Sequence, residues 1–482
     1  MSDAPGAGIE LKRATLVALG AAILGAMLIP GQPAGLNIVL VTVLTSTAVL
    51  VGGGWELGRF GLAAGASAFL LMTNFVVRTA EWVLALDALG ALVLGVVAIT
   101  RPQTWHEVIR ACIEALGRLP AGLGFTARPV TGVARNLAPG RALLIGRGVL
   151  AGLALTIVFG GLLASADQAF ASIARDAVLP RVDLSLLPAR VIIGLVVAAG
   201  TGALVLLIRH PLSVRGTWVS FGPESVARRK LNAIEWLPGI ILLDLVFGLF
   251  VAVQIAVLFG DHRHVLVTEG LTYAQYARQG FFQLLAVVGL TIGVIAAVVN
   301  FGDLSSTRMR RVARLSLGVL CALTFVILMS AHFRLALYEE AYGLTRLRLL
   351  VHATIVWFAV LLVLIAVAGA FWRALWIPRT VLLLTAAGLL CLNVVNPDAV
   401  IAQRNIDRYE ETGRIDPFYL GGLSHDAVPV LATLEEPMRS CVLGIKAART
   451  SDGSSLSAFN FSRERAREIL RSVQAPTESC PR

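Results

Sequence analysis

Long uninterrupted blocks of apolar residues recur along the chain and are separated by short polar stretches. A hydrocarbon core about 30 Å thick needs roughly 20 helical residues to cross it, and the blocks have that length. They predict eleven membrane-spanning helices, at residues 11–29, 34–52, 57–77, 80–99, 146–166, 189–208, 237–259, 281–301, 313–335, 347–370 and 377–396. The expected fold is therefore all-α: a polytopic membrane helix bundle of about eleven spans, with a small, mostly helical C-terminal extramembrane domain.

The spans and loops divide the chain into four expected parts. Residues 1–100 form an N-terminal four-span region, 101–145 a basic cytoplasmic loop with an interfacial helix, 146–396 a seven-span core, and 397–482 an extracytoplasmic C-terminal domain. In the loop, apolar residues from Trp105 to Leu116 recur at helical spacing opposite charged ones. This pattern indicates a helix lying in the inner membrane surface, and packing under the helix bundle is the alternative.

Composition and charge agree with a membrane protein. Hydrophobic residues make up 57% of the chain and charged residues 15%, whereas about a quarter of the residues in a typical soluble domain are charged. The net charge of +11 does not favour nucleic-acid binding, because the basic residues gather in short loops without interleaved aromatic residues. The expected partners are the lipid bilayer and, at the basic inner loops, anionic lipids; the sequence identifies no protein partner.

The distribution of basic residues predicts the orientation of the chain. If the N-terminus is cytoplasmic, 21 of the 41 Lys and Arg residues lie in inner loops and eight in outer loops. Cytoplasmic loops carry the excess of Lys and Arg in membrane proteins, so this arrangement is favoured. An odd number of spans then places the C-terminus outside. We expect a multi-pass protein of the bacterial cytoplasmic (inner) membrane, with its N-terminus in and its C-terminus out.

The sequence contains no motif that is diagnostic of a particular catalytic or cofactor-binding chemistry. The sequence lacks GxxxxGK[ST], HExxH, GxSxG and a GxGxxG in a credible context, so ATP hydrolysis, zinc proteolysis, serine hydrolysis and dinucleotide binding are without support. We expect no cofactor and no metal site, since no Cys/His set has zinc spacing. Cys441 and Cys480 lie in the polar tail and are expected to form a disulfide if the tail faces an oxidising compartment.

Ionisable residues inside spans are costly and are therefore functional candidates. Asp87 and Asp244 are the two acids deep in predicted spans. On the expected topology they differ in depth by roughly 10 Å, so we do not expect them to pair directly. A proton or ion relay is one interpretation, and protonated or hydrogen-bonded structural acids are the other, which we favour.

Polar residues gather in segments that are expected at the outer face. Residues 267–282 and 332–352 place Tyr, Arg and Glu residues beside span ends, with Gly343 as a natural helix stop. These segments predict a ligand-binding constellation of Glu269, Tyr273, Tyr276, Arg278, Arg334, Tyr338, Glu339, Tyr342, Arg346 and Arg348. Arg forks and Tyr hydroxyls suit an anionic or sugar-like ligand. An aromatic belt with snorkelling arginines and internal salt bridges is an equally weighted alternative.

Three segments carry a family resemblance: YAQYARQGFFQL (273–284), LYEEAYGLTRLRL (337–349) and NPDAVIAQRNI (396–406). In order and in position beside spans they resemble a bacterial multi-pass inner-membrane family known as domain of unknown function 4173, and its close relative 4153. The resemblance is strongest over roughly residues 230–430. It implies a membrane location and supplies no catalytic residues.

The sequence favours a function without fixing its chemistry. We favour a non-enzymatic membrane protein that senses or organises something at the outer surface through the Tyr/Arg/Glu constellation. A secondary transporter is one alternative, although deep polar residues are few and no symmetry between the halves is evident. A membrane-embedded transferase acting on an envelope or lipid-linked substrate, with Glu269 or Glu339 as base, is the other. The sequence predicts neither a specific ligand nor an oligomeric state.

Overall fold

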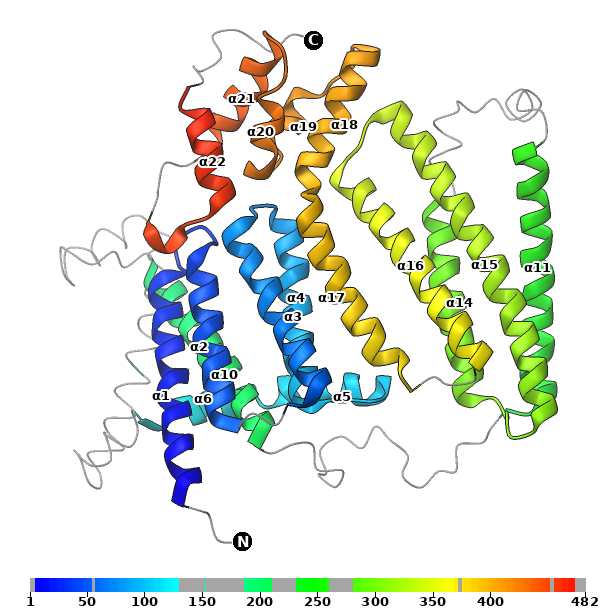
Figure 1. The fold of residues 1–482 in the computed structure, drawn as a ribbon, viewed down its shortest axis with the longest axis horizontal. Coiled ribbons are helices and arrows are strands. Elements are labelled where there is room, and N and C mark those ends of the chain that lie inside the picture. The colour runs from blue at the N-terminus through cyan, green and yellow to red at the C-terminus, as the bar shows by residue number, and fades with distance from the viewer. Residues whose placement is uncertain are drawn as a thin grey trace. The chain divides into compact units, whose positions relative to one another are not determined.

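The computed structural model describes residues 5–53, 57–129, 152, 186–209, 231–259, 281–371, 375–450 and 455–472. Among these residues, ten helices are long and apolar enough to cross a membrane. They are α1 (Pro5–Leu28), α2 (Leu36–Gly53), α3 (Gly58–Val77), α4 (Glu81–Thr100), α10 (Leu187–Arg209), α11 (Ala233–Phe259), α14 (Phe281–Phe301), α15 (Thr307–Tyr342), α16 (Arg346–Phe371) and α17 (Ile377–Val395) (Figure 1). The predicted all-α polytopic fold is confirmed, and the chain is a multi-pass membrane protein.

The predicted spans correspond closely to these helices. Ten of them coincide with a described helix, and the remaining one, at 146–166, lies outside the described residues apart from Gly152. The largest difference is at α15, a helix of 36 residues, of which the prediction covers only 313–335. Polar and charged residues at both ends of α15 lower its hydropathy, although the backbone continues as a helix.

The described helices pack as two compact units that do not follow the order of the chain. Unit 1 comprises Met1–Gly216, Leu382–Asn396 and Gly421–Arg482, and unit 2 comprises Thr217–Val381 and Pro397–Leu420. The C-terminal segment therefore packs with the N-terminal helices. The expected division of the chain at residues 100, 145 and 396 stays a prediction.

In unit 1, α1 pairs with α2 and α10, and α3 pairs with α4. Small residues let these helices approach one another. A Cβ at Gly61 would lie only 2.7 Å from the carbonyl oxygen of Ala98, so α3 and α4 meet at a distance that only glycine permits. Apolar residues such as Leu71, Leu94 and Ala386 then form a core between α3, α4 and α17.

The amphipathic stretch predicted after the fourth span is helix α5 (Trp105–Gly117). Its apolar residues divide between two sides. Val108 and Ala111 are buried against the helices of unit 1, whereas four residues at spacings of three or four are exposed: Trp105, Ile109, Ile113 and Leu116. The helix thus combines packing under the bundle with an exposed apolar stripe. Its location in the membrane surface stays a prediction.

The C-terminal segment of unit 1 consists of short helices, namely α20 (Val428–Leu431), α21 (Met438–Ala448) and α22 (Phe461–Leu470). Its side chains hold the turns at one end of the spanning helices. Asn460 Nδ2 donates to the carbonyls of Phe75 and Arg78, at 2.8 Å each, while its Oδ1 accepts the N–H of Arg463 and so caps α22. Arg463 Nη2 in turn donates to the carbonyl of Ala34 at 3.0 Å. These bonds satisfy carbonyls that a helix end or turn leaves without an intrahelical partner.

Asp426 fastens the same segment to the start of α4. Its Oδ2 accepts the backbone N–H groups of Thr79 and Ala80, at 2.9 Å each, and the hydroxyl of Ser424 at 3.0 Å. Asn396, directly after α17, donates through Nδ2 to the Asp426 carbonyl at 3.3 Å. Only 3% of Asp426 is exposed, and Ala80 provides no cap of its own. A carboxylate far away in sequence therefore serves as the N-terminal cap of α4.

In unit 2, α11, α14, α15 and α16 enclose one apolar core. Buried residues of α15, including Leu317, Leu320, Ile327 and Leu335, recur at helical spacing and face this core. Helices α18 (Pro397–Thr412) and α19 (Pro417–Gly421) follow the last span, and α18 packs against α16.

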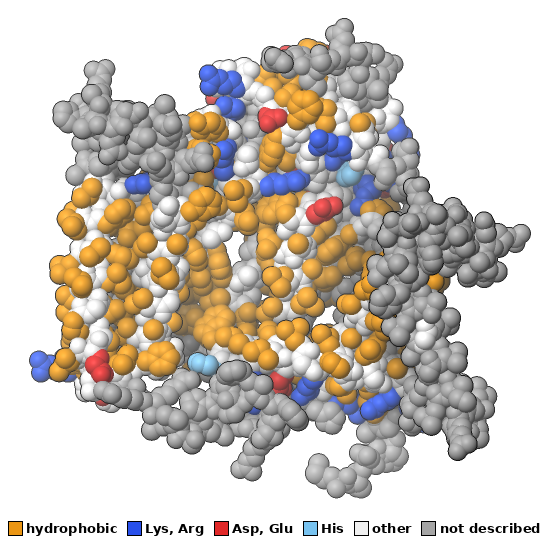
Figure 2. All heavy atoms as spheres, turned by 180° about the vertical axis from the view of Figure 1, so that it is seen from behind, with side chains coloured by type: hydrophobic (Ala, Val, Ile, Leu, Met, Phe, Trp, Pro, Cys, Tyr) orange, Lys and Arg blue, Asp and Glu red, His pale blue; other side chains and the backbone are white. Residues whose placement is uncertain are grey.

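The surface agrees with a membrane setting. In Figure 2, hydrophobic side chains cover the lengths of the spanning helices, and Lys, Arg, Asp and Glu side chains gather toward their ends. Large apolar residues in the middle of spans are well exposed, for example Leu92 at 67% and Leu249 at 68%. Large apolar side chains exposed along the length of a spanning helix suit a surface that lipid covers.

Candidate functional site

The turn between α15 and α16 gathers most of the described members of the predicted constellation. Helix α15 ends at Tyr342, and Gly343 adopts φ +77°, which confirms the predicted helix stop. A Cβ at Gly343 would collide with Oδ1 of Asn405 on α18, whose Nδ2 donates to the Leu344 carbonyl at 2.8 Å. Glycine therefore allows α18 to lie directly against the turn. We call the residues around it the turn cluster: Tyr338, Glu339, Tyr342, Arg346 and Arg348.

Arg346 is held by the segment that follows the last span. Its Nε lies 3.0 Å from Asp398 Oδ1 and its Nη2 lies 2.5 Å from Oδ2, which makes a bidentate ion pair. Asp398 is completely buried, whereas 38% of the Arg346 side chain is exposed. The backbone N–H of Arg346 donates to the Tyr419 hydroxyl at 2.8 Å. Burial raises the pKa of Tyr419, although the bond and charge of Arg346 oppose the rise, so this phenol stays protonated.

Arg348 stacks on the two tyrosines of the turn cluster. Its guanidinium carbon lies 4.2 Å from the ring centroid of Tyr338 and 5.9 Å from that of Tyr342. The two rings are themselves in contact, with centroids 5.0 Å apart. One N–H of the guanidinium donates to the carbonyl of Gly343. Stacking of this kind orients the guanidinium plane while leaving its remaining donors along the edge.

Glu339 lies beside two histidines. Its Oε1 is 2.7 Å from Nε2 of His352 on α16, and the rings of His352 and His332 meet edge to face with centroids 5.2 Å apart. About a fifth of each side chain of the Glu339–His352 pair is exposed, 21% and 22% respectively. Within the described chain, no three His, Cys, Asp or Glu side chains are arranged to hold a metal ion.

Arg334, which is also predicted as a ligand residue, is linked to α11. Its Nη2 donates to Oε1 of Gln254 at 3.2 Å, and the Ser330 hydroxyl donates to the same oxygen at 3.1 Å. The amide oxygen of Gln254 thus joins a polar pair on α15 to the neighbouring span. Such interhelical hydrogen bonds are an ordinary means of fixing membrane helices.

Several predicted residues lie outside the described residues: Glu269, Tyr273, Tyr276, Arg278 and Cys480. Their part in the constellation stays a prediction. Cys441 is disulfide-bonded, and the other described cysteines, Cys112, Cys321 and Cys391, are free thiols. The specific pairing of Cys441 with Cys480 also stays a prediction.

The two intramembrane acids differ in their surroundings. Asp87 in unit 1 is completely buried and accepts hydrogen bonds from the amides of Asn74 and Asn393. Asp244 in unit 2 is partly exposed, and its Oδ1 has no hydrogen-bond partner among the described residues. Amide partners of Asp87 on two other helices were not predicted, because Asn74 and Asn393 are far apart in sequence and carry no motif.

Two residues that fix the turn cluster are not members of the predicted constellation. Asp398 follows Pro397 at the start of α18, where an acidic residue is ordinary because it favours the helix N-terminus. Tyr419 is one aromatic residue in a polar tail. Only the return of α18 and α19 to the turn makes these side chains partners of Arg346.

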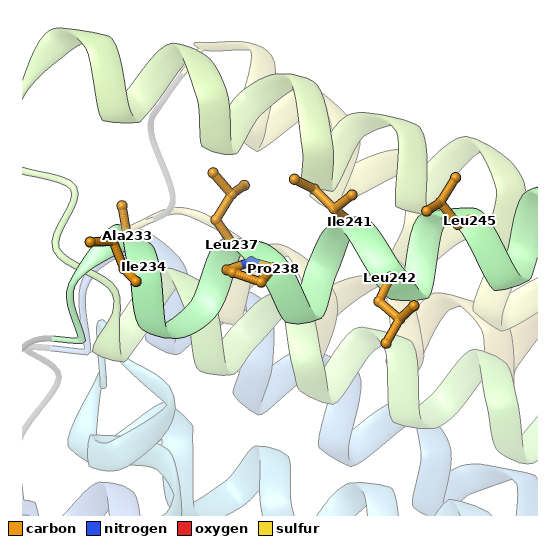
Figure 3. Close-up of a pocket in the computed structure, with 7 residues that line it drawn as sticks. All are labelled: Ala233, Ile234, Leu237, Pro238, Ile241, Leu242 and Leu245. Carbon is orange, nitrogen blue, oxygen red and sulfur yellow. The ribbon is translucent and has the colours of Figure 1, made fainter.

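A groove on unit 2 offers no polar chemistry. It has a volume of about 620 Å³, and Figure 3 shows its lining side chains along a single helix, α11. The lining residues are all apolar: Ala233, Ile234, Leu237, Pro238, Ile241, Leu242 and Leu245. A site that binds a polar ligand needs at least a few convergent polar groups. The groove suits hydrocarbon, so the turn cluster remains the stronger candidate site.

Comparison with known proteins gives one family. Residues 65–434 match the family described as Domain of unknown function (DUF4153). No curated protein and no solved structure matches the chain. The match confirms the resemblance to 4153, whereas the label of domain of unknown function 4173 is not confirmed.

Proposed function

The chain belongs to the family of Domain of unknown function DUF4153, and from this premise we propose that it is a non-enzymatic sensory or organising protein of the bacterial cytoplasmic membrane. The turn cluster serves as its outward-facing site and binds an anionic ligand. Arg348 is the residue that contacts the negative charge, with Tyr338 and Tyr342 beside it.

The stacking of Arg348 is the observation that carries this proposal. A guanidinium has five N–H donors, and in the described chain Arg348 uses one of them, toward the Gly343 carbonyl. Its plane is fixed by Tyr338, and Tyr342 is 55% exposed beside it. An arginine that is oriented in advance and retains free donors matches the two-oxygen edge of a phosphate or carboxylate.

The other two charged residues of the turn cluster are engaged in internal pairs. Arg346 is engaged with buried Asp398, and Glu339 with His352. These pairs fix the ends of α15 and α16, as the salt-bridge interpretation of the constellation expects. Within the turn cluster, Arg348 and the two tyrosines therefore suit the ligand-binding interpretation. Arg346 and Glu339 suit the interpretation as internal salt bridges.

The arrangement of unit 1 supports an orientation with the C-terminus outside. Its C-terminal segment binds the α1–α2 and α3–α4 turns, through contacts to Ala34, Phe75 and Thr79. The described basic residues near the opposite helix ends are Lys12, Arg13, Arg59, Arg101, Arg110, Arg118 and Arg209, whereas those beside span ends on the side of the C-terminal segment are Arg78 and Arg190. An excess of basic residues marks the cytoplasmic side. This argument does not depend on counting the span expected at 146–166.

The arrangement of unit 2 supports the same orientation for the turn cluster. Helix α15 begins with Arg308, Arg310, Arg311 and Arg314, and the cluster lies at its other end. A helix of 36 residues is about 54 Å long, which is more than the thickness of a bilayer core. With the basic end in the cytoplasm, the turn cluster reaches the outer surface.

Removal of the Arg348 guanidinium is expected to weaken anion binding by about 10- to 100-fold, since one or two charge-assisted hydrogen bonds are lost. The full chain, in nanodiscs of zwitterionic lipid, is titrated with inorganic phosphate, with acetate and with a short-chain anionic phospholipid. Arg348→Ala is compared with the unchanged chain by calorimetry. The three probes distinguish a free phosphate, a carboxylate and a lipid headgroup.

Arg311→Ala provides the matched control, because Arg311 is an exposed arginine at the basic end of α15, the helix that carries Tyr338 and Tyr342 at its other end. It is expected to leave the affinity unchanged. The proposal fails if none of the anions binds the unchanged chain, or if the two alanine variants lose affinity equally.

Orientation is tested with single cysteines in a cysteine-free background. The first variant is Glu435→Cys, at an exposed position of the C-terminal segment. The second is Arg110→Cys on α5, where the Arg110 side chain is 49% exposed. A membrane-impermeant maleimide applied to intact cells is expected to label the first and not the second until the membrane is permeabilised. Labelling of Arg110→Cys alone would reverse the orientation.

A further inference from the structure

Asp87 lies in a closed polar site inside unit 1, where three spanning helices meet. It is the seventh residue of α4, about 9 Å along the helix from its start, and none of it is exposed. Asn74 of α3 donates to its Oδ2 at 3.1 Å. Asn393 of α17 donates to Oδ1 at 3.0 Å and to Oδ2 at 2.9 Å.

The charged residues on the neighbouring elements do not form an ion pair with Asp87 among the described residues. Arg78, the residue directly after α3, donates through its Nε and Nη2 to the carbonyls of Asn393 and Val394. The other ionisable residue of α4 is Glu81, which is exposed at the start of the helix, and the C-terminal segment contributes Asp426, which caps that start. The described residues form no ion pair with Asp87, so its partners are the neutral amides.

Neutral amides do not compensate a full negative charge in a membrane. A buried carboxylate without a counter-charge costs many kcal/mol, and it is ordinarily avoided by protonation or by a bound cation. Asp87 therefore requires a positive charge that the protein itself does not supply within hydrogen-bonding reach.

The side-chain oxygen of Asn393 is a second indication that a positive charge binds here. Its Nδ2 is occupied by both Asp87 oxygens and by the Leu389 carbonyl at 2.9 Å. Its Oδ1 is buried, in a residue that is 3% exposed, and has no hydrogen-bond partner in the described chain. An amide oxygen that is buried beside a carboxylate needs a donor or a cation.

We propose that Asp87 and Asn393 form an intramembrane site that binds a single positive charge, either a proton or a sodium ion. As a proton site, Asp87 carries the hydrogen and the Asn393 amide oxygen accepts it after rotation of the amide. As a sodium site, the carboxylate and, after the same rotation of the amide, the Asn393 oxygen are ligands, as oxygen groups are for hard cations. This site is independent of the turn cluster and of the function proposed for it.

The test uses the full chain in nanodiscs and a hydrophobic carbodiimide, which modifies protonated carboxyl groups within membranes. Peptide mass spectrometry measures modification of Asp87 in mildly acidic buffer, with sodium chloride or with choline chloride. We expect Asp87 to be modified in choline chloride. Protection by sodium identifies a sodium site, and labelling that is equal in both salts but falls as the pH rises identifies a proton site.

Infrared difference spectroscopy on the same preparation does not depend on access of the reagent. The protonated carboxyl band of the sodium-free chain is expected to disappear in Asp87→Asn and to persist in Asp244→Asn, the matched acid of another span. Asn393→Leu is expected to weaken sodium protection by about tenfold, because it removes the amide oxygen that serves as a ligand. The proposal is overturned if Asp87 remains ionised at every pH tested and sodium changes neither signal.

Discussion

Replacement of Asp398 by alanine is expected to destabilise unit 2 by on the order of 3 kcal/mol, because it leaves the Arg346 guanidinium without its buried partner. The lost interaction is a bidentate pair, with distances of 3.0 and 2.5 Å, to a carboxylate that is completely buried. The free energy of unfolding is measured by denaturant titration of the full chain in micelles. Since α18 is held by this pair, hydrogen exchange over 397–412 is expected to rise.

Asp407→Ala is the matched control. Asp407 lies on the same helix, and among the described residues its side chain accepts one exposed hydrogen bond, from Gln403 at 2.8 Å. Its loss is therefore expected to change stability by less than about 0.5 kcal/mol. The double variant Arg346→Met with Asp398→Leu is expected to recover much of the stability, because an apolar pair carries no unpaired charge. Equal effects of Asp398→Ala and Asp407→Ala would refute the role given to the pair.

Replacement of Asp426 by alanine is expected to release the C-terminal segment from the start of α4. Two backbone N–H groups, those of Thr79 and Ala80, and the Ser424 hydroxyl lose their shared acceptor. Loss of a helix cap costs about 0.5–2 kcal/mol, and each buried donor left unpaired adds about 1–3 kcal/mol. We expect a local destabilisation of on the order of 3 kcal/mol, read as faster hydrogen exchange over 79–84 and faster proteolysis of 421–472.

Asp426→Asn distinguishes the contribution of the hydrogen-bond acceptor at this position from that of its negative charge. The amide oxygen can still accept from the α4 N-terminus, so this variant is expected to lose only part of the protection. Glu435→Ala, at an exposed position of the same segment, is expected to have no effect. If Asp426→Ala leaves exchange over 79–84 unchanged, the capping contact does not stabilise the docked segment.

The span pattern and the helix stop at Gly343 could be predicted because each depends on local properties. Apolar blocks have the length that a bilayer requires, and ten of the predicted spans are helices among the described residues. Gly343 supplies the positive φ that ends α15. The predicted span at 313–335 is shorter than α15 (Thr307–Tyr342), because the prediction follows hydropathy and the polar ends of this helix are not hydrophobic.

The candidate sites could be predicted only in part. Tyr338 and Tyr342 are four residues apart on α15, so helical spacing brings their rings together. Arg348 meets them only because the chain turns at Gly343 and enters α16. Asn393 and Asp87 are 306 residues apart, and Asp426 lies 346 residues from Ala80. No periodicity relates residues at such separations, and amide or carboxylate side chains carry no spacing signature that would reveal them.

The sequence by itself determined that this chain crosses a membrane many times, because hydrocarbon solvates only long apolar helices whose backbone bonds are internal. The tertiary structure decided which polar residues meet. It placed the segment after residue 420 in unit 1 and α18 in unit 2, and so gave Asp426 and Asp398 their partners. The physical reason is that the average hydrophobicity of about 20 consecutive residues decides whether a helix enters the membrane, and this average can be calculated from the sequence. A hydrogen bond or an ion pair instead requires two groups within a set distance, which only the folded chain provides.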